Sequence, residues 1–262
     1  LLVLDTKDDE NKSYYGTGLI AGQASFFGPS NDLNIDVKAK TLEGTKFIIP
    51  LSDVKGVENS SLIHFKKIKK IEEEDLFLDK AGLLEKIQGL SLSFDLDVTK
   101  DAVAEVVIDK VSGSSLEGNG SGNILVEIDT KGEFKMFGDF LVEKGVYNFI
   151  YGGVINKPFQ VAKGGVVSWD GDPYNADLNI TALHRVKANP KILLESLNTN
   201  RKIDIDLITK IRGKLFNSSN EFDIVIPNSS SVVASELDFK LNDNDDNAKM
   251  RQFFSLLISK SF

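Results

Sequence analysis

The chain of 262 residues contains no cysteine, one tryptophan, two methionines and two histidines. The absence of cysteine excludes disulfide bonds, thiolate metal ligands and cysteine nucleophiles. His64 and His184 lie far apart in sequence, and neither belongs to a carboxylate–histidine pattern of the kind that binds metal. We therefore expect no metal site and no cofactor.

Long apolar runs and an excess of basic residues are also missing. No run approaches the roughly 20 apolar residues that a membrane-spanning helix needs. The start, Leu1–Asp5, lacks the basic region and the length of a signal peptide, and it has the pattern of a strand cut from a longer chain. We therefore expect any anchor to lie outside this chain. The net charge of −8 argues against binding to nucleic acid.

The strongest positive signal is alternation of apolar and polar residues, which is typical of strands with one apolar face. The clearest runs are Leu90–Val98 and Leu33–Ala39. Further runs are Ile124–Ile128, Leu178–Ala182, Ile203–Leu207, Phe222–Ile226 and Leu237–Leu241. At the usual spacing of about 8–12 residues, the chain would hold on the order of twenty strands. Short connections predict an all-β, antiparallel sheet, and frequent glycines predict bulges and strong curvature. A faint repeat between Phe27–Ile35 and Trp169–Ile180 predicts that the sheet is elongated.

Two segments depart from this pattern. Residues 75–88 carry apolar positions at helical spacing and predict a short amphipathic helix, preceded by a charged loop. The segment Asn247–Ser261 is the clearer amphipathic helix. Its expected apolar stripe consists of Met250, Phe253, Phe254, Leu257 and Ile258.

Motifs that would carry chemistry are not found. The glycine cluster Gly118–Gly122 runs into a strand pattern, whereas a phosphate-binding loop leads into a helix. The acidic run Asp243–Asp246 lacks the glycine and the terminal glutamate of an EF-hand. No nucleophile elbow occurs in a strand–turn–helix context. We therefore expect a protein that is not an enzyme.

The apolar strand faces allow two arrangements. They can cover each other in a closed core, or they can line a groove that accepts acyl chains or unfolded strands. Alternation alone favours the closed core. In either arrangement, we expect one concave face to carry Leu92, Phe94, Leu96, Ile124, Val126, Ile128, Leu178, Ile180, Ile203, Ile205, Phe222 and Ile224.

Three motifs follow one another between Gly145 and Ala182. They are a glycine–x–tyrosine hairpin at Gly145–Tyr147, a strand at Phe159–Gly164, and a Gly-Asp-Pro-x-Asn turn before a strand at Gly171–Ala182. This order resembles the C-terminal domain of the TamB translocation and assembly module family, with Ala176 and Asn179 replacing the usual proline and aspartate. The flanks resemble the Bacteroidetes-type branch at Tyr15–Gly18, Gly44–Ser52, Phe222–Pro227 and Arg251–Leu257.

The resemblance covers nearly the whole chain. It implies one domain over residues 1–262, a fragment of a longer protein, with a possible loop or break near 66–89. It also implies a β-taco, a U-shaped sheet whose apolar face lines an open groove, as in AsmA-like bridge proteins. It further implies a periplasmic location in a Gram-negative bacterium, with an inner-membrane anchor outside this chain and an Omp85-type outer-membrane barrel of the TamA/BamA kind as partner.

Two functions fit this resemblance. The first is a conduit that carries phospholipid between the inner and outer membranes. The alternative is a chaperone that assembles or translocates outer-membrane proteins by strand pairing. In both cases we expect the C-terminal helix to cover one end of the apolar face, as a cap or as a gate beside the barrel. Its acidic lead-in would be repelled by an anionic bilayer.

Overall fold

The computed structural model of the chain describes residues 1–7, 14–29, 32–50, 89–109, 112–129, 133–151, 155–194, 200–241 and 248–262. The helix expected over 75–88 lies outside the described residues. The loop expected over 66–89 also lies outside them, apart from Gly89. The same is true of His64 and of the acidic run Asp243–Asp246.

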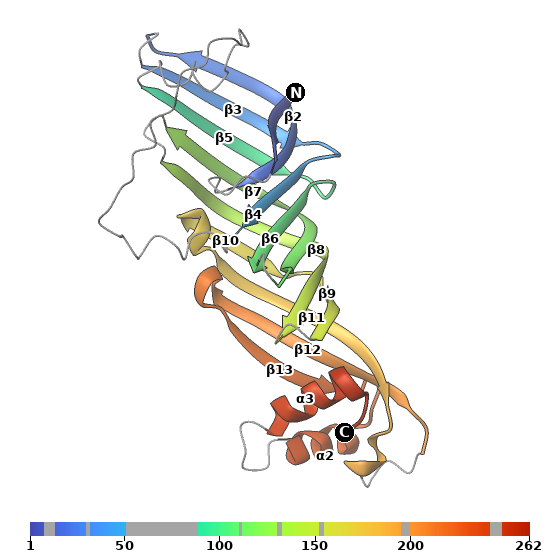
Figure 1. The fold of residues 1–262 in the computed structure, drawn as a ribbon. Helices are drawn as coiled ribbons and strands as arrows, with labels where there is room; N and C mark the ends of the chain where they lie inside the picture. The colour runs from blue at the N-terminus through green and yellow to red at the C-terminus, as the bar shows by residue number, and fades with distance from the viewer. Residues whose placement is uncertain are drawn as a thin grey trace, which may run out of the picture.

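Thirteen strands of the described chain form one elongated, curved sheet, with two α-helices at its C-terminal end (Figure 1). The helices are α2 (Ser231–Leu241) and α3 (Ala248–Ser259). The strands are β1 (Leu2–Thr6), β2 (Tyr15–Phe27), β3 (Leu33–Thr41), β4 (Lys46–Pro50), β5 (Leu90–Val98), β6 (Val103–Asp109), β7 (Ser114–Asp129), β8 (Phe134–Tyr151), β9 (Ile155–Val161), β10 (Val166–Gly171), β11 (Asp177–Ala188), β12 (Ile203–Lys214) and β13 (Ser219–Val225). The expected curved, mainly β fold is confirmed.

The sheet turns a corner along its length and so has two walls. β2 pairs with β3 through Ile20–Phe27 and with β4 through Tyr15–Thr17, so β3 and β4 are two halves of one interrupted strand. In the same way β5 and β6 share β7, and β10 and β9 share β8. We call the part with β3, β5 and β10 the first wall and the part with β4, β6 and β9 the second wall. Figure 1 shows the second wall in front of the first.

The corner is made by interruptions in some strands and by a bulge in others. The interruptions are the connections Leu42–Thr45, Thr99–Ala102 and Ala162–Gly165. In β8 the register shifts between Val142 and Lys144, so Glu143 has no opposite residue in β7. A Cβ at Gly120, which faces this bulge, would collide with the carbonyl oxygen of Leu141. Only glycine allows the strands to approach this closely.

Side chains tie the successive corners together. The backbone N–H of Thr99 donates to Thr41 Oγ1 at 2.8 Å. The Glu143 carboxylate accepts from Lys163 Nζ at 2.6 Å and from Lys100 Nζ at 3.1 Å. Hydrogen bonds from Lys163 and then Lys100 hold the pKa of Glu143 below its ordinary value. The bulge residue in β8 therefore links the corner between β5 and β6 to the corner between β9 and β10.

Strand direction and strand length differ from the expectation. β3 pairs with β5, and β4 pairs with β6, in parallel. The chain leaves the second wall at Pro50 and enters the first wall again at Leu90, so the two interrupted strands run in the same direction. The segment between them is long enough for the crossover that parallel pairing requires. In the part of the chain that the structure describes, β7 and β8, of 16 and 18 residues, pass through the corner unbroken and are longer than the expected strands.

The segment Leu237–Leu241 was expected to be a strand and instead lies in α2, so that prediction is wrong. Five alternating residues place the first and last apolar side chains four positions apart, which also satisfies the helical period. In α2, Leu237 and Leu241 are buried together with Val233, whereas Phe239 is 67% exposed. The helix also has a start signal, because Ser230 Oγ accepts from the backbone N–H of Val233 at 3.4 Å.

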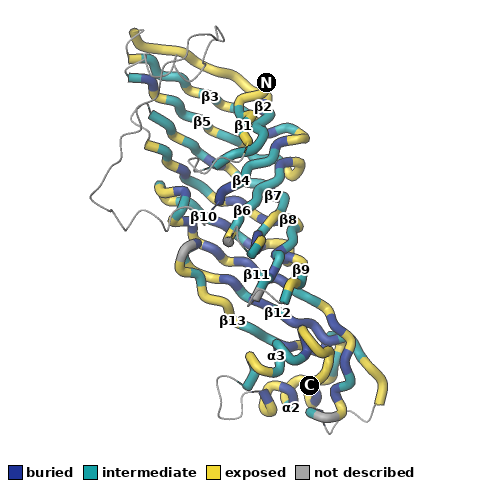
Figure 2. The backbone as a smooth tube through the Cα atoms, in the orientation of Figure 1, coloured by how far each residue is buried: buried dark blue, intermediate teal, exposed yellow. Residues whose placement is uncertain are grey.

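Burial differs between the two ends of the sheet (Figure 2). The strands near the N-terminus are mostly intermediate or exposed, whereas β11, β12 and the inner side of α3 are rich in buried positions. The fully buried side chains of this region include Ile180, Ile205, Leu207, Phe253 and Leu256. The most deeply buried part of the core therefore sits at the C-terminal end, whereas the N-terminal strands are more exposed.

Candidate functional site

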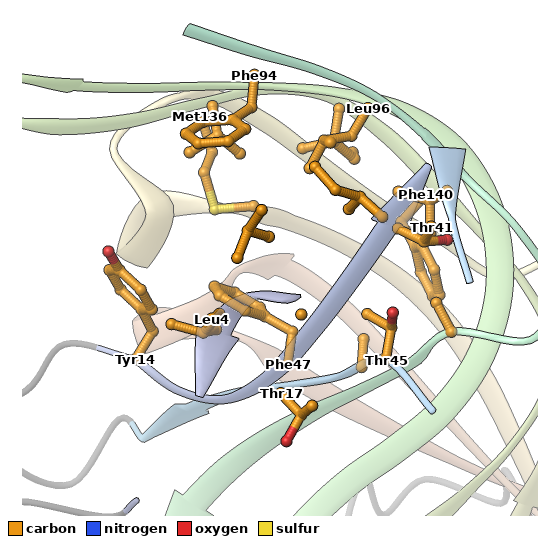
Figure 3. A pocket seen from close by; sticks show the side chains of 18 of the residues that line it. Leu4, Tyr14, Thr17, Thr41, Thr45, Phe47, Phe94, Leu96, Met136 and Phe140 are labelled. Atoms are coloured by element: carbon orange, nitrogen blue, oxygen red, sulfur yellow. The ribbon is translucent and has the colours of Figure 1, made fainter. Parts of the chain in front are cut away.

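A cavity of about 220 Å³, partly open to solvent, lies between the two walls in the N-terminal half (Figure 3). Phe94 and Leu96 of β5 line it from the first wall, and Phe47 of β4 lines it from the second. The N-terminal strand β1 contributes Val3 and Leu4. The lining is mainly aliphatic and aromatic, with a few threonine hydroxyls and the Tyr14 hydroxyl, so the cavity suits an apolar ligand.

Aromatic rings connect the two walls across this cavity. Tyr14 stacks on Phe134 of β8, with ring centroids 4.6 Å apart, and packs on Phe47, with centroids 5.4 Å apart. Burial, and then the nearby Tyr174, raise the pKa of the Tyr14 hydroxyl. The tyrosine therefore stays neutral at physiological pH and adds apolar surface to the lining.

Trp169 of β10 lines the same cavity and is held in place by the turn that follows its strand. Its indole N–H donates to the carbonyl oxygen of Pro173 at 3.1 Å. Asp172 Oδ1 accepts from the backbone N–H of Tyr174 at 2.9 Å and caps the short turn. The Gly-Asp-Pro-x-Asn motif thus builds the turn that fixes the one tryptophan of the chain in the groove.

The structure divides the twelve residues expected on the concave face into two groups, and none of them is exposed. Five line the cavity: Phe94, Leu96, Ile124, Val126 and Ile128. Leu92 lies on the same face of β5 and is partly buried, but it does not line the cavity. The other six lie on strands of the closed C-terminal half: Leu178, Ile180, Ile203, Ile205, Phe222 and Ile224.

The sequence argument missed much of the cavity lining. Phe47, Tyr14 and Trp169 were not among the expected residues, because they come from short or irregular segments. Met136 and Phe140 of β8 were also missed, because the apolar residues Phe137 and Leu141 on the opposite face interrupt the alternation. The phase of β8 then changes at the bulge, since the buried positions beyond it are odd-numbered.

Helix α3 closes the C-terminal half of the concave face. Phe253 lies 4.6 Å from Phe222 of β13 and 6.1 Å from Phe159 of β9, measured between ring centroids. Phe254 lies 6.2 Å from Phe149 of β8. Leu257 is buried as well. The aromatic side chains of the helix therefore pack against β8, β9 and β13 on the concave face.

The inward face of α3 differs from the one expected. Met250 and Ile258 were expected in the buried stripe, and they are 41% and 61% exposed. Leu256 was not expected there and is fully buried. The helix rests on the sheet on one side and approaches α2 on another, so its inward face is rotated toward Leu256. Hydrophobic spacing cannot show this rotation, because the apolar residues of α3 extend around more than one face.

Several charged side chains of the described residues form ion pairs between neighbouring strands. Arg185 of β11 and Asp206 of β12 form a two-point ion pair, with Nε–Oδ1 and Nη2–Oδ2 distances of 2.6 and 2.8 Å. Hydrogen bonding to Asp206 raises the pKa of the guanidinium. Lys46 contacts both Glu105 and Glu117 at 2.8 Å, so it separates two carboxylates that face each other across β6 and β7. Within the described residues, no group of three or more candidate metal ligands is found.

These features define a class of protein: a sheet bent into a two-walled groove, open and apolar at one end and closed by a helix at the other. A family model described as the TamB C-terminal domain matches residues 1–260. The chain belongs to this family, whose members are cell-envelope proteins that serve outer-membrane biogenesis. No curated protein matches the chain. Within the described residues, no helix is long and apolar enough to cross a membrane.

Proposed function

We propose that this domain binds the acyl chains of phospholipid in its groove and so conducts lipid between the inner and outer membranes. The observation that carries the proposal is the cavity between the walls, lined by aromatic and aliphatic side chains from both. Shielding a hydrocarbon chain from water is worth about 0.8 kcal/mol per buried CH₂ group. A groove that holds a chain by apolar contact needs no reacting group, so the proposed role is not enzymatic.

The location and partner are part of the same proposal. Family membership supports a periplasmic position and an Omp85-type barrel of the TamA/BamA kind as the outer-membrane partner. The inner-membrane anchor would lie outside this chain. No energy-coupling motif was found in the sequence, so lipid would move down a gradient or be driven by another component.

Trp169 provides a direct test of lipid binding, because it is the only tryptophan and it lines the cavity. Bromine atoms on an acyl chain quench tryptophan fluorescence on contact. We expect vesicles of phosphatidylethanolamine with a dibrominated stearoyl chain to quench Trp169. Vesicles of the same lipid without bromine should leave the intensity unchanged.

A matched control moves the tryptophan to the other face of the sheet. Leu141 of β8 is 42% exposed and pairs with Val166 of β10, three residues before Trp169. In the double variant W169F/L141W, the probe lies on the convex face of the same wall. Quenching of the parent but not of this variant supports the groove. Equal quenching of both, or of neither, contradicts it.

A specific observation also supports the alternative function, strand-pairing assistance to outer-membrane proteins. The outer edge of β2 pairs with β1 only as far as Ile20, and residues 21–27 have no strand partner on that side in the described chain. Phe26 and Phe27, at the end of this edge, are 66% and 50% exposed. Such an edge can accept a further strand.

Photo-crosslinking separates the two functions. A photoreactive residue replaces Ser25 on the β2 edge or Leu96 in the groove, and each variant is offered purified phospholipid and a purified unfolded outer-membrane barrel protein. Lipid adducts at Leu96 support the conduit. Protein adducts at Ser25 without lipid adducts at Leu96 support the chaperone.

A further inference from the structure

The apolar face of the cavity continues without a break into the region beneath α3. Hydrogen-bonded register places Phe140 opposite Val167, Val167 opposite Leu178, and Ile180 opposite Ile211. These side chains lead from the cavity of the N-terminal half to the strands on which α3 rests. The two halves therefore share one surface of one chemical type, and they differ in what covers it.

In the C-terminal half, helix α3 covers the concave apolar face. The side chains of Phe253, Leu256 and Leu257 of α3 are almost completely buried. Phe253 packs between Phe222 and Phe159, which come from β13 and β9. The helix therefore presents hydrocarbon to the same kind of surface that lines the open cavity.

The polar contacts between α3 and the sheet are weak. The side-chain oxygen Oε1 of Gln252 is buried without a hydrogen-bond partner, which disfavours the seated position. The ion pair from Lys249 Nζ to Asp223 Oδ1 is long, at 3.6 Å, and both side chains are partly exposed. The helix is thus seated by apolar burial, which another hydrocarbon surface can replace.

The outer side of α3 is also partly apolar. Met250 and Ile258 are exposed, whereas Phe254 packs on Phe149 and Phe222 of the sheet. A helix that serves only as a fixed cover would present a polar outer side. Apolar side chains on two sides are suited to a helix that leaves one apolar surface for another.

We propose that the concave face beneath α3 is a second site for a phospholipid acyl chain, in which the helix stands in for the chain until lipid displaces it. The inference rests on the proposed lipid-binding function of the groove. Lipid that binds only when the helix is away must shift the helix equilibrium, because a ligand shifts a population by its differential affinity. The lipid would then leave the groove at the end where α3 now lies.

Hydrogen exchange of the unmodified protein tests this inference. The same brominated phosphatidylethanolamine vesicles are added at a concentration that saturates the quenching of Trp169. We expect the amides of α3 to exchange faster by roughly tenfold, within the usual range of coupling between sites. The amides of β7 and β8 should stay protected. Saturated quenching with unchanged or increased protection of α3 would overturn the inference and leave the proposed function intact. Absence of quenching would overturn the proposed function first.

A pair of variants checks the same point independently. F253A/L257A weakens the seat of α3, whereas M250A/I258A removes apolar groups from its exposed side. We expect the first to bind lipid roughly fivefold more tightly than the parent, because the helix competes less. The second should not bind more tightly than the parent, because the buried contacts of the helix are unchanged. Equal effects of the two variants would show that the buried side of the helix does not compete with lipid. Should the first variant fail to fold, the exchange measurement decides alone.

Discussion

A single aspartate placed at two positions of the concave face distinguishes an open groove from a closed core. Leu96 lines the cavity and is partly buried, whereas Ile180 is 0% exposed and lies in the closed C-terminal half. The two residues have the same chemical character and share one face of one sheet. Leu96→Asp and Ile180→Asp therefore differ mainly in whether the new carboxylate can reach water.

The expected magnitudes differ several-fold. Loss of a fully buried isoleucine removes about 1.5–3 kcal/mol of burial energy. An unpaired carboxylate in the core adds several kcal/mol of desolvation or the cost of staying protonated. Ile180→Asp should therefore lower the free energy of unfolding by at least about 4 kcal/mol, a large part of the 5–15 kcal/mol typical of a domain. Leu96→Asp loses part of one leucine burial, about 1 kcal/mol, because its carboxylate can be hydrated.

Urea unfolding followed by far-ultraviolet circular dichroism measures both changes. Leu141→Asp is the control, since this leucine is 42% exposed on the convex face, and it should change the free energy of unfolding by about 0.5 kcal/mol or less. Leu96→Asp should also abolish quenching of Trp169 by brominated lipid. Equal losses of stability at Leu96 and Ile180 would refute the distinction between an open and a closed half.

Three further outcomes concern a strained glycine of β8, the corner and the convex face. Gly138 has a φ of +117°, so Gly138→Ala should cost at least about 1–3 kcal/mol in urea unfolding. Hydrogen bonds from lysine lower the pKa of Glu143 in the folded protein. The contribution of Glu143 to the free energy of unfolding should therefore be complete above its ordinary pKa of about 4.3, and it should be lost as the pH falls through the lower pKa of the folded state. Asp206→Ala leaves Arg185 without its two-point partner and should lower the midpoint of thermal unfolding.

Each of these outcomes has its own check. For the corner, the parent and Glu143→Gln are compared over a range of pH, and a stability difference that persists in strong acid would contradict the assignment. For the convex face, Asp204→Ala is the matched control, because its partner Lys187 is 72% exposed and the pair should contribute little. A Gly138→Ala protein as stable as the parent would show that this position tolerates a side chain.

Local alternation was sufficient to predict much of the sheet. The run Leu90–Val98 became β5 with the expected ends, and six of the seven alternating runs lie wholly or mainly in strands. The reason is that the period of two is a property of the backbone, so a strand with one buried face records that face in its own residues. The strong curvature also left a local trace, because only glycine fits where strands approach each other as closely as at Gly120.

Other features depend on how distant segments meet. The period of Leu237–Leu241 fits a helix as well as a strand, and burial in the folded chain decided for the helix. Parallel pairing of β3 with β5 follows from the path of the chain between the walls. The exposure of Ile258 depends on how α3 rests on the sheet.

The separation of an open cavity from a closed core also belongs to the tertiary structure. Leu96 and Ile180 have equivalent local patterns, so alternation assigns both to an apolar face and says nothing about what lies opposite. Opposite Leu96, the second wall leaves a cavity; Ile180 lies in the half that α3 covers. The sequence by itself determined which side chains share a face. The bend of the sheet and the position of α3 determined which of them remain available to a ligand, because that depends on contacts between residues far apart in the chain.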